Sequence, residues 1–224
     1  MENATTQLPQ TRIVLNKEIR KLLKITFSGF VLVFIPAMTV LLARHLNYVS
    51  EVPVPSFRQK GPENAPVQIT EYTDFACPGC GHANQTLHTL FSLYPGKIHL
   101  KFKHYPLKTI HKWSLDAAIA ADCAGKQGKF WDYADRLFET QEKWNGSLQK
   151  PGEFLEIALK TGIKKDIFES CLSDTGTIKA VEMDCAEGDF KDIHATPTFF
   201  INKERVVGPK QLLEKTKFFD RLSK

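Results

Sequence analysis

The most informative stretch of this chain is EYTDFACPGC, residues 71–80. It overlaps the strand-like run Val67–Tyr72 and ends in two cysteines three positions apart. If a helix begins at Cys77, that residue lies where unpaired backbone N–H groups and the positive end of the helix dipole favour a thiolate. Cys80, one turn later, can close a disulfide ring with it. The stretch therefore predicts a redox-active cysteine pair.

Two structural alternatives compete with the redox interpretation: half of a zinc site, and a structural disulfide. A zinc ribbon needs a second close pair of Cys or His ligands. The other cysteines, Cys123, Cys171 and Cys185, stand alone in the sequence. We therefore expect no metal site and favour disulfide exchange.

The segments around the cysteine pair predict a β-α-β unit. Val67–Tyr72 and Lys97–His104 alternate apolar and polar residues, which is typical of strands. The helix that begins at the cysteines should end at Tyr94-Pro95-Gly96, because proline and glycine interrupt helices. Two strands joined by a helix of this length are expected to lie side by side in one sheet.

The rest of the chain predicts a block of helices and then a hairpin with a last helix. The predicted helices of the block, within about 112–190, are Ser114–Ala124, Gly128–Gln141, Glu153–Lys160, Lys165–Leu172 and Thr177–Asp189. Pro197–Asn202 and Arg205–Val207 predict the hairpin, and Gln211–Leu222 the last helix. This order indicates an α/β protein: a thioredoxin fold with a helical insertion between its β-α-β half and its C-terminal hairpin and helix.

Four motifs in this order resemble the DsbA-like thiol-disulfide oxidoreductase family. They are GPENAPV (61–67), EYTDFACPGC (71–80), CAGKQGKFW (123–131) and ATPTFF (195–200). The resemblance covers about residues 61–222. It implies an enzyme that donates the Cys77–Cys80 disulfide to unfolded or partly folded exported proteins, with no cofactor beyond that disulfide. It also implies a membrane redox partner that reoxidises or reduces the pair.

The resemblance also assigns roles to single residues. Cys77 would attack and Cys80 would resolve the mixed disulfide, while Glu71 would transfer the proton of the second thiol. An exposed strand carboxylate is the alternative for Glu71, since strand alternation leaves its face open. Pro197 would be a cis-proline facing the cysteines, and the Thr196 backbone would bind an extended substrate.

The resemblance bears on two further features, the dipeptide between the cysteines and a second disulfide. Pro78-Gly79 carries no side chain that can donate charge to Cys77, unlike the Pro-His of the family's best-known oxidases, so we expect a weaker oxidant. Some family members have a structural disulfide at positions like Cys123 and Cys171. Two buried free thiols, or pairing of Cys171 with Cys185, remain alternatives because sequence does not determine connectivity.

The N-terminal part predicts a membrane anchor. Residues 25–43 contain no charged residue and are long enough to cross a bilayer, and basic residues precede them. A cleaved signal peptide would have a shorter apolar region. We expect a cytoplasmic tail (1–24), a transmembrane helix (25–43), a linker (44–64) and a thioredoxin-like domain (65–224). This arrangement implies a single-pass protein of the bacterial inner membrane, with its catalytic domain in the periplasm.

The charge balance limits the possible partners. The net charge is +5, but residues 1–50 hold six Lys/Arg and two Asp/Glu, which leaves 24 and 23 for the remainder. This near-neutral remainder gives no support for nucleic-acid binding. As a separate expectation, the protein should be a monomer. The alternative functions are a reductase or isomerase of exported disulfides and, in another class, a metal carrier or chaperone-like module on the same fold.

Overall fold

The computed structural model describes residues 31, 34–42, 51–215 and 219. The chain divides into two compact units, Met1–Glu51 and Val52–Lys224. The sheet, the helices within residues 78–214 and all five cysteines belong to the second unit.

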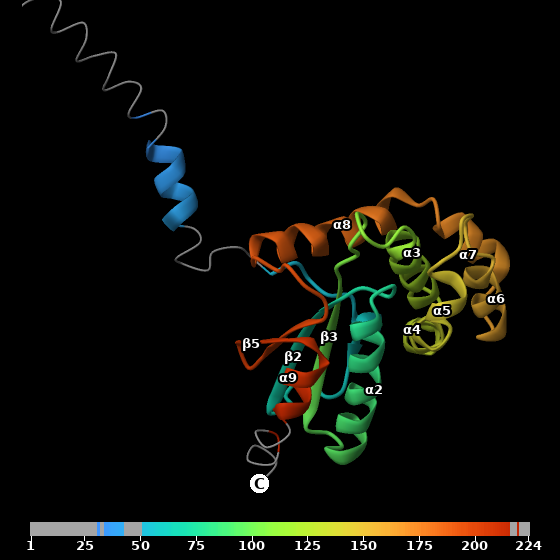
Figure 1. The fold of residues 1–224 in the computed structure, drawn as a ribbon, viewed down its shortest axis with the longest axis horizontal. Coiled ribbons are helices and arrows are strands. Elements are labelled where there is room, and N and C mark those ends of the chain that lie inside the picture. Colours follow the sequence, from blue (N-terminus) through green and yellow to red (C-terminus); the bar gives the residue numbers. More distant parts are fainter. Residues whose placement is uncertain (1–30, 32–33, 43–50, 216–218, 220–224) are drawn as a thin grey trace, which may run out of the picture. The chain divides into compact units, whose positions relative to one another are not determined.

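A five-stranded mixed sheet forms the centre of this unit, in the order β1-β3-β2-β4-β5 (Figure 1). Its strands are β1 (Gln59–Lys60), β2 (Val67–Thr73), β3 (Ile98–His104), β4 (Thr198–Ile201) and β5 (Glu204–Val207). β2 and β3 are parallel, whereas the other neighbours are antiparallel. This sheet with its helices is a thioredoxin-like α/β fold, as predicted.

One face of the sheet packs against α2 (Pro78–Leu93) and α9 (Gly208–Glu214). Alternate residues of β2, Val67 and Ile69, are buried there with apolar side chains of both helices. Because side chains alternate along a strand, Glu71 and Thr73 point to this same face. The strand thus directs a carboxylate and a hydroxyl toward the helix that begins after Cys77.

The helical insertion lies between β3 and β4 and has its own apolar core (Figure 1). Its helices are α3 (Ser114–Gly125), α4 (Phe130–Glu139), α5 (Gln141–Trp144), α6 (Glu153–Lys160), α7 (Lys165–Cys171) and α8 (Thr175–Phe190). The predicted helix Gly128–Gln141 is divided in two at Thr140, where φ and ψ leave the helical region. Phe75 and Phe102 pack into this core, with their rings 5.4 Å apart, and so join the insertion to the sheet.

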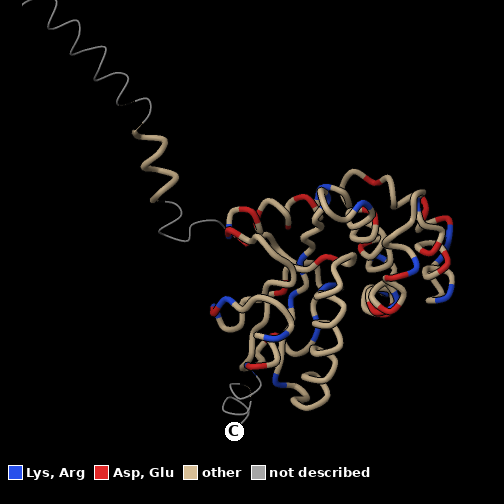
Figure 2. The backbone as a smooth tube through the Cα atoms, in the orientation of Figure 1, with Lys and Arg blue, Asp and Glu red and all other residues tan. Residues whose placement is uncertain are grey.

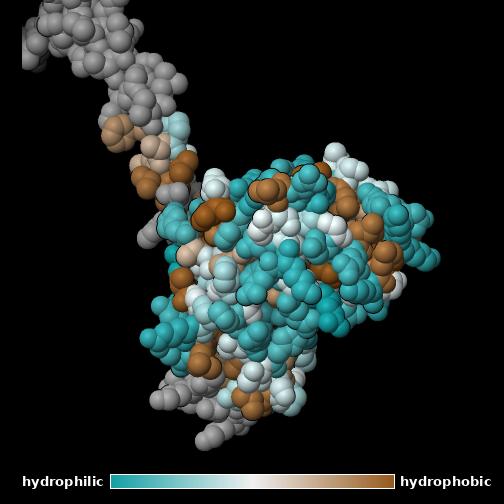
Figure 3. All heavy atoms as spheres, turned by 45° about the vertical axis from the view of Figure 1, so that its right-hand side comes forward, coloured by the Kyte–Doolittle hydropathy of each residue, from teal (hydrophilic) through white to brown (hydrophobic). Residues whose placement is uncertain are grey.

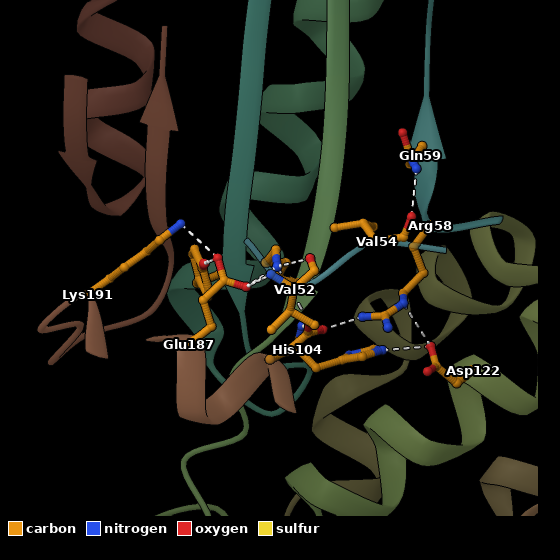
Figure 4. Close-up of polar contacts among 11 residues, drawn as sticks. Val52, Val54, Arg58, Gln59, His104, Asp122, Glu187 and Lys191 are labelled. Atoms are coloured by element: carbon orange, nitrogen blue, oxygen red, sulfur yellow. Dashed lines mark hydrogen bonds and ion pairs between the residues drawn. The ribbon is translucent and has the colours of Figure 1, made fainter. Parts of the chain in front are cut away.

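The predicted linker at residues 44–64 is wrong for residues 52–60, which belong to the folded unit. Ser56–Arg58 form a 3-10 helix, η1, and β1 pairs with β3. Arg58 is 1% exposed; its Nε lies 3.3 Å from Asp122 Oδ1, and its Nη1 is bonded to Asp184 (Figure 4). A buried guanidinium needs such partners. The prolines and glycine here therefore shape turns within the fold, and residues 43–50 lie outside the described part of the chain.

A second group of contacts holds the start of this unit. Glu187 of α8 is paired with Lys103 of β3, and both side chains bind the main chain of Val52. Figure 4 shows the Glu187 carboxylate beside Val52. The Val52 N–H donates to Glu187 Oε2 at 3.0 Å, and Lys103 Nζ donates to Val52 O at 2.8 Å. Charged residues of the sheet and of the insertion thus fix the segment that the sequence assigned to a tether.

The predicted membrane localisation is contradicted by the structure. Within the described residues no helix has both the length and the apolar character needed to cross a bilayer. Of the segment 25–43, residues 31 and 34–42 are described and helical, and the remaining positions lie outside the described residues. The last predicted helix also differs: α9 spans Gly208–Glu214, and most of its predicted continuation is not described.

Residues of both charge signs are spread over the second unit (Figure 2). On the face drawn in Figure 3, hydrophilic side chains predominate and hydrophobic ones form several small patches. Interspersed charges of opposite sign produce a weak long-range field. The reactivity of the cysteines must therefore come from groups in their immediate surroundings.

Candidate active site

The cysteine pair lies at the N-terminus of α2. Cys77 is the N-cap residue and Pro78 begins the helix, where a missing N–H leaves no bond unmade. The Cys77 carbonyl accepts hydrogen bonds from Cys80 N at 3.0 Å and Gly81 N at 3.3 Å. Cys77 is half-buried, whereas Cys80 is fully buried. Only the first cysteine is therefore open to another protein.

The loop before β4 faces Cys77. The Thr196–Pro197 peptide bond is cis, and Cys77 Sγ lies 3.4 Å from Thr196 O. A Cβ atom at Gly79 would lie 3.5 Å from Pro197 Cδ and 3.7 Å from Cys77 Sγ. The dipeptide between the cysteines therefore packs directly against this loop, and a side chain at position 79 would border the sulfur.

Hydrogen-bond donors lower the pKa of Cys77 from 9.0 to about 5. The Cys80 thiol contributes most, and the Thr196 side chain and the backbone N–H groups of Cys80 and Gly79 add to it, while partial burial opposes the shift. A thiolate at a helix N-terminus is stabilised in this way. At neutral pH Cys77 is therefore ionised in the reduced protein.

Cys80 has the opposite electrostatics. Burial, together with the neighbouring Cys77, raises its pKa well above the usual value. The Asp74 N–H donates to Cys80 Sγ at 3.4 Å, which offsets only part of this effect. Two sulfurs in one helical turn thus differ in their charge at neutral pH, and Cys80 keeps its proton.

Glu71 is buried, so the alternative of an exposed strand carboxylate is wrong. Its exposed fraction is 2%, and burial raises its pKa from 4.5 to about 8, against a smaller lowering by Thr73. Thr73 also lowers the pKa of Cys80, so its side chain lies near both groups. Its hydroxyl is buried without a hydrogen bond of ordinary length among the described residues. A neutral carboxylic acid and the Thr73 hydroxyl thus lie on the Cys80 side of the strand.

Asp74 organises the turn before Cys77 rather than the first turn of α2. Its Oδ1 accepts from Ala76 N at 2.8 Å, and its Oδ2 accepts from Leu107 N at 2.9 Å and from His111 Nδ1 at 2.7 Å. The N-cap side chain itself makes no capping bond. Asp74 therefore joins this turn, residues 74–77, which we call the redox turn, to the loop after β3. It acts as an orienting residue.

Two amide side chains that the sequence analysis did not single out contact the same turn. Gln141 Nε2 donates to Phe75 O and Cys77 O, and Asn145 Nδ2 donates to Ala76 O. Nothing in the sequence marks them, because amides near a helix end are common and their partners are more than 60 positions away. His82, two positions after Cys80, is an exposed residue of α2.

The remaining cysteines lie in the insertion. Cys123 of α3 and Cys171 of α7 form a disulfide, the pair that the resemblance implied, with Cα atoms 5.7 Å apart. Cys185 is free, and burial raises its pKa to about 11. Pairing of Cys171 with Cys185 is therefore wrong. Among the described residues no group of three or more potential ligands is arranged to hold a metal ion.

Comparison with known proteins places this geometry among thioredoxin-fold proteins. A family model described as thioredoxin matches residues 56–221. The crystal structure of α-DsbA1 from Wolbachia pipientis superposes with a TM-score of 0.67 at 25% identity, covering 81% of this chain and 96% of that one. DsbA2 from Pseudomonas aeruginosa superposes with a TM-score of 0.61 at 25% identity, covering 75% and 96%.

Curated relatives match over only a small part of their length. A Na(+)/H(+) antiporter NhaA of Salinispora arenicola is 36% identical over 171 residues, which are 73% of this chain and 25% of that protein. Its counterpart in Salinispora tropica is 34% identical over 150 residues, 67% and 22% respectively. This chain thus spans about a quarter of the relatives it matches.

Proposed function

This chain belongs to the thioredoxin family and to its DsbA-like thiol-disulfide oxidoreductases, and from that premise we propose that it works as an oxidase that donates the Cys77–Cys80 disulfide to cysteine-containing proteins. The observation that supports this direction is the low pKa of Cys77, about 5, beside a Cys80 that stays protonated. A stabilised thiolate favours the reduced enzyme, and an enzyme whose reduced form is stable gives up its disulfide readily.

In the first step a substrate thiolate attacks Cys77 Sγ of the oxidised enzyme. The Cys77–Cys80 bond breaks, a mixed disulfide joins the substrate to Cys77, and the electron pair leaves on Cys80 Sγ. Attack falls on Cys77 because it is half-exposed, whereas Cys80 is fully buried. The leaving sulfur then carries a charge in a buried site and needs a proton.

Glu71 is the proton donor for this sulfur. Its pKa of about 8 keeps it neutral and protonated at pH 7, so it can neutralise Cys80 and then regain a proton from solvent. Thr73 lies near both groups and can pass the proton between them, since a hydroxyl both donates and accepts.

In the second step another substrate thiolate attacks the substrate sulfur of the mixed disulfide. The bond to Cys77 breaks, the substrate disulfide forms, and the electron pair leaves on Cys77 Sγ. The low pKa makes Cys77 a good leaving group. The enzyme has then accepted two electrons from the substrate, and it needs a separate redox partner to reoxidise Cys77 and Cys80.

Substrate binding is proposed at the loop that faces Cys77. The Thr196 main chain lies beside the sulfur, at 3.4 Å from its carbonyl oxygen, and precedes the β4 strand. An extended peptide can pair with such a main chain as an added strand, which recognises backbone rather than sequence. Unfolded or partly folded proteins with cysteines are the substrates that this mode of binding suits.

The oxidase direction is tested with purified protein and a reduced peptide that contains two cysteines. We expect the oxidised wild type to convert the peptide to its disulfide stoichiometrically. We expect Cys80→Ser to accumulate a mixed disulfide with the peptide and Cys77→Ser to form none. If the oxidised enzyme leaves the peptide reduced while the reduced enzyme opens a peptide disulfide, the chain works as a reductase and the oxidase proposal fails.

A further inference from the structure

The helical insertion reaches the redox turn through side-chain amides. Gln141 Nε2 donates to Phe75 O at 2.6 Å and to Cys77 O at 3.0 Å, and Asn145 Nδ2 donates to Ala76 O at 2.9 Å. The carbonyl groups of three consecutive residues before α2 are thus bound by two side chains. The donors lie 64 to 69 positions away from their acceptors. The contacts therefore join the insertion to the segment that carries the reactive sulfur.

Packing within the insertion fixes the position of Gln141. It begins α5, and Trp144 and Asn145 follow on the same face of the helix, three and four positions later. Trp144 is fully buried, donates from Nε1 to Leu137 O at 3.0 Å, and packs its ring 5.3 Å from that of Phe154. Gln141 is 9% exposed. The packing of α5 in the apolar core of the insertion therefore fixes the Gln141 side chain. Its amide N–H groups point to the two carbonyl oxygens that accept from them.

These bonds bear on the backbone angles of Cys77. The plane of the Cys77 carbonyl determines its ψ, 121°, and the plane of the Ala76 carbonyl determines its φ, −82°. Those two angles decide where Sγ lies relative to the N–H groups of Gly79 and Cys80. A donor that holds each carbonyl therefore also holds the sulfur over the end of the helix.

We propose that Gln141, assisted by Asn145, is a positioning residue of the redox site: its amide fixes the Cys77 backbone so that the helix N–H groups and the Cys80 thiol face the Cys77 thiolate. The α5 segment then contributes to the oxidising strength of the cysteine pair, although its bonds are to main-chain carbonyl groups and not to the sulfur atoms. This inference rests on the proposed function in one respect, since it takes Cys77 to be the reactive thiolate.

The test compares the thiolate titration of reduced Gln141→Leu with that of the wild type, followed by ultraviolet absorbance of the thiolate. Leucine keeps the approximate size of the side chain and removes the donors. We expect the pKa of Cys77 to rise by about 0.5–1 unit, the effect of about one hydrogen bond. The equilibrium constant for reduction of the disulfide by glutathione should fall by about 3- to 10-fold, because the reduced form loses the same stabilisation.

Two further variants keep the test decisive. Asn145→Ala removes one bond at a half-buried position and should raise the pKa in the same direction by less, even if Gln141→Leu does not fold. Gln127→Leu is the matched control, because the Gln127 amide also bonds main chain within the insertion, but at Lys164 rather than at the carbonyl groups of residues 75–77. It should leave the Cys77 pKa unchanged.

An unchanged titration in folded Gln141→Leu and Asn145→Ala, with only a loss of thermal stability, would show that the amides are merely structural. An equal shift in Gln127→Leu would have the same meaning. A wild-type Cys77 that titrates near 9 contradicts the proposed function instead, so the two failures are distinguishable.

Discussion

The two cysteine pairs of this protein show how strongly surroundings govern the same chemical group. Cys77 and Cys80 lie three positions apart at a helix end, with donors around the first sulfur, and both are free. Cys123 and Cys171 are 48 positions apart, buried in the core of the insertion, and joined. The first pair has a charged, accessible sulfur, while the second closes a long loop in an apolar environment. Reactivity thus comes from the donors and exposure at one sulfur, and stabilisation comes from the length of the loop.

The largest expected effect is the loss of all exchange in Cys77→Ser. Without the exposed sulfur no mixed disulfide can form. Removal of Cys123 and Cys171 together should leave the initial rate within about twofold, since neither sulfur takes part in the exchange. The rate of oxidation of a dithiol peptide measures both. Residual exchange in Cys77→Ser, or its loss in the double variant, would break the contrast between the pairs.

For the free energy of unfolding, the Cys123–Cys171 disulfide is expected to matter more than the redox pair. The double variant Cys123→Ala with Cys171→Ala should lower the free energy of unfolding by about 2–4 kcal/mol, because the loop closed by this disulfide is long. Denaturant unfolding of the oxidised proteins measures it, with Cys185→Ala as a control that breaks no bond. A double variant as stable as the control would mean that the buried disulfide does not stabilise the insertion.

A smaller effect is expected from Glu71→Gln, which removes the proton donor beside Cys80. The first exchange step should slow by about 10-fold or more at pH 7, and the pH dependence near 8 should disappear. Stability changes in the opposite sense: a carboxyl whose pKa is raised on folding destabilises the native state as pH rises from 4.5 toward 8. The variant should therefore gain stability over the wild type at pH 8 but not at pH 4. Equal pH profiles for the two proteins would remove Glu71 from the mechanism.

The smallest expected change is that of Gly79→His. The glycine has room for a Cβ in ordinary contact with Pro197 and Cys77 Sγ, so an imidazole there would border the sulfur. A donor or positive charge should lower the Cys77 pKa by about 0.5–1 unit and make the enzyme a stronger oxidant. The glutathione equilibrium measures this, with Gly152→His as the control, because Gly152 precedes α6 and a Cβ there would meet no atom within 4 Å. An equilibrium constant equal to that of the wild type would show that the dipeptide does not tune this site, and a weaker oxidant would show that the imidazole does not stabilise the thiolate.

Most of the fold was predictable because its signals are local. The alternation in Val67–Tyr72 and Lys97–His104, and the helix-breaking Pro95-Gly96, can be recognised from neighbouring residues alone. The observed strands differ from these ranges by one residue each. The start of the folded unit could not be predicted from local signals. Residues 52–60 look like a linker by composition. Partners far away in the sequence, among them Asp122 and Asp184 at the Arg58 side chain, show that they are part of the domain.

The site divides in the same way. The spacing of Cys77 and Cys80 predicts the redox pair, and the family resemblance led to Glu71, Thr196 and Pro197. Gln141 and Asn145 could not be found, because their role depends on a three-dimensional approach of α5 to the redox turn. The predicted membrane localisation rested on an apolar stretch of sequence alone, and no helix in the described part of the chain has the length and apolar character to cross a bilayer.

Titration of the thiolate absorbance of the reduced protein tests the central claim most directly. The account predicts one transition with a midpoint near pH 5, assigned to Cys77 by its absence in Cys77→Ser, and no further thiolate until strongly alkaline pH, since burial raises the pKa of Cys80 and Cys185. A first transition near pH 9, or one near pH 5 that persists in Cys77→Ser, would contradict the assignment of Cys77 as the stabilised nucleophile.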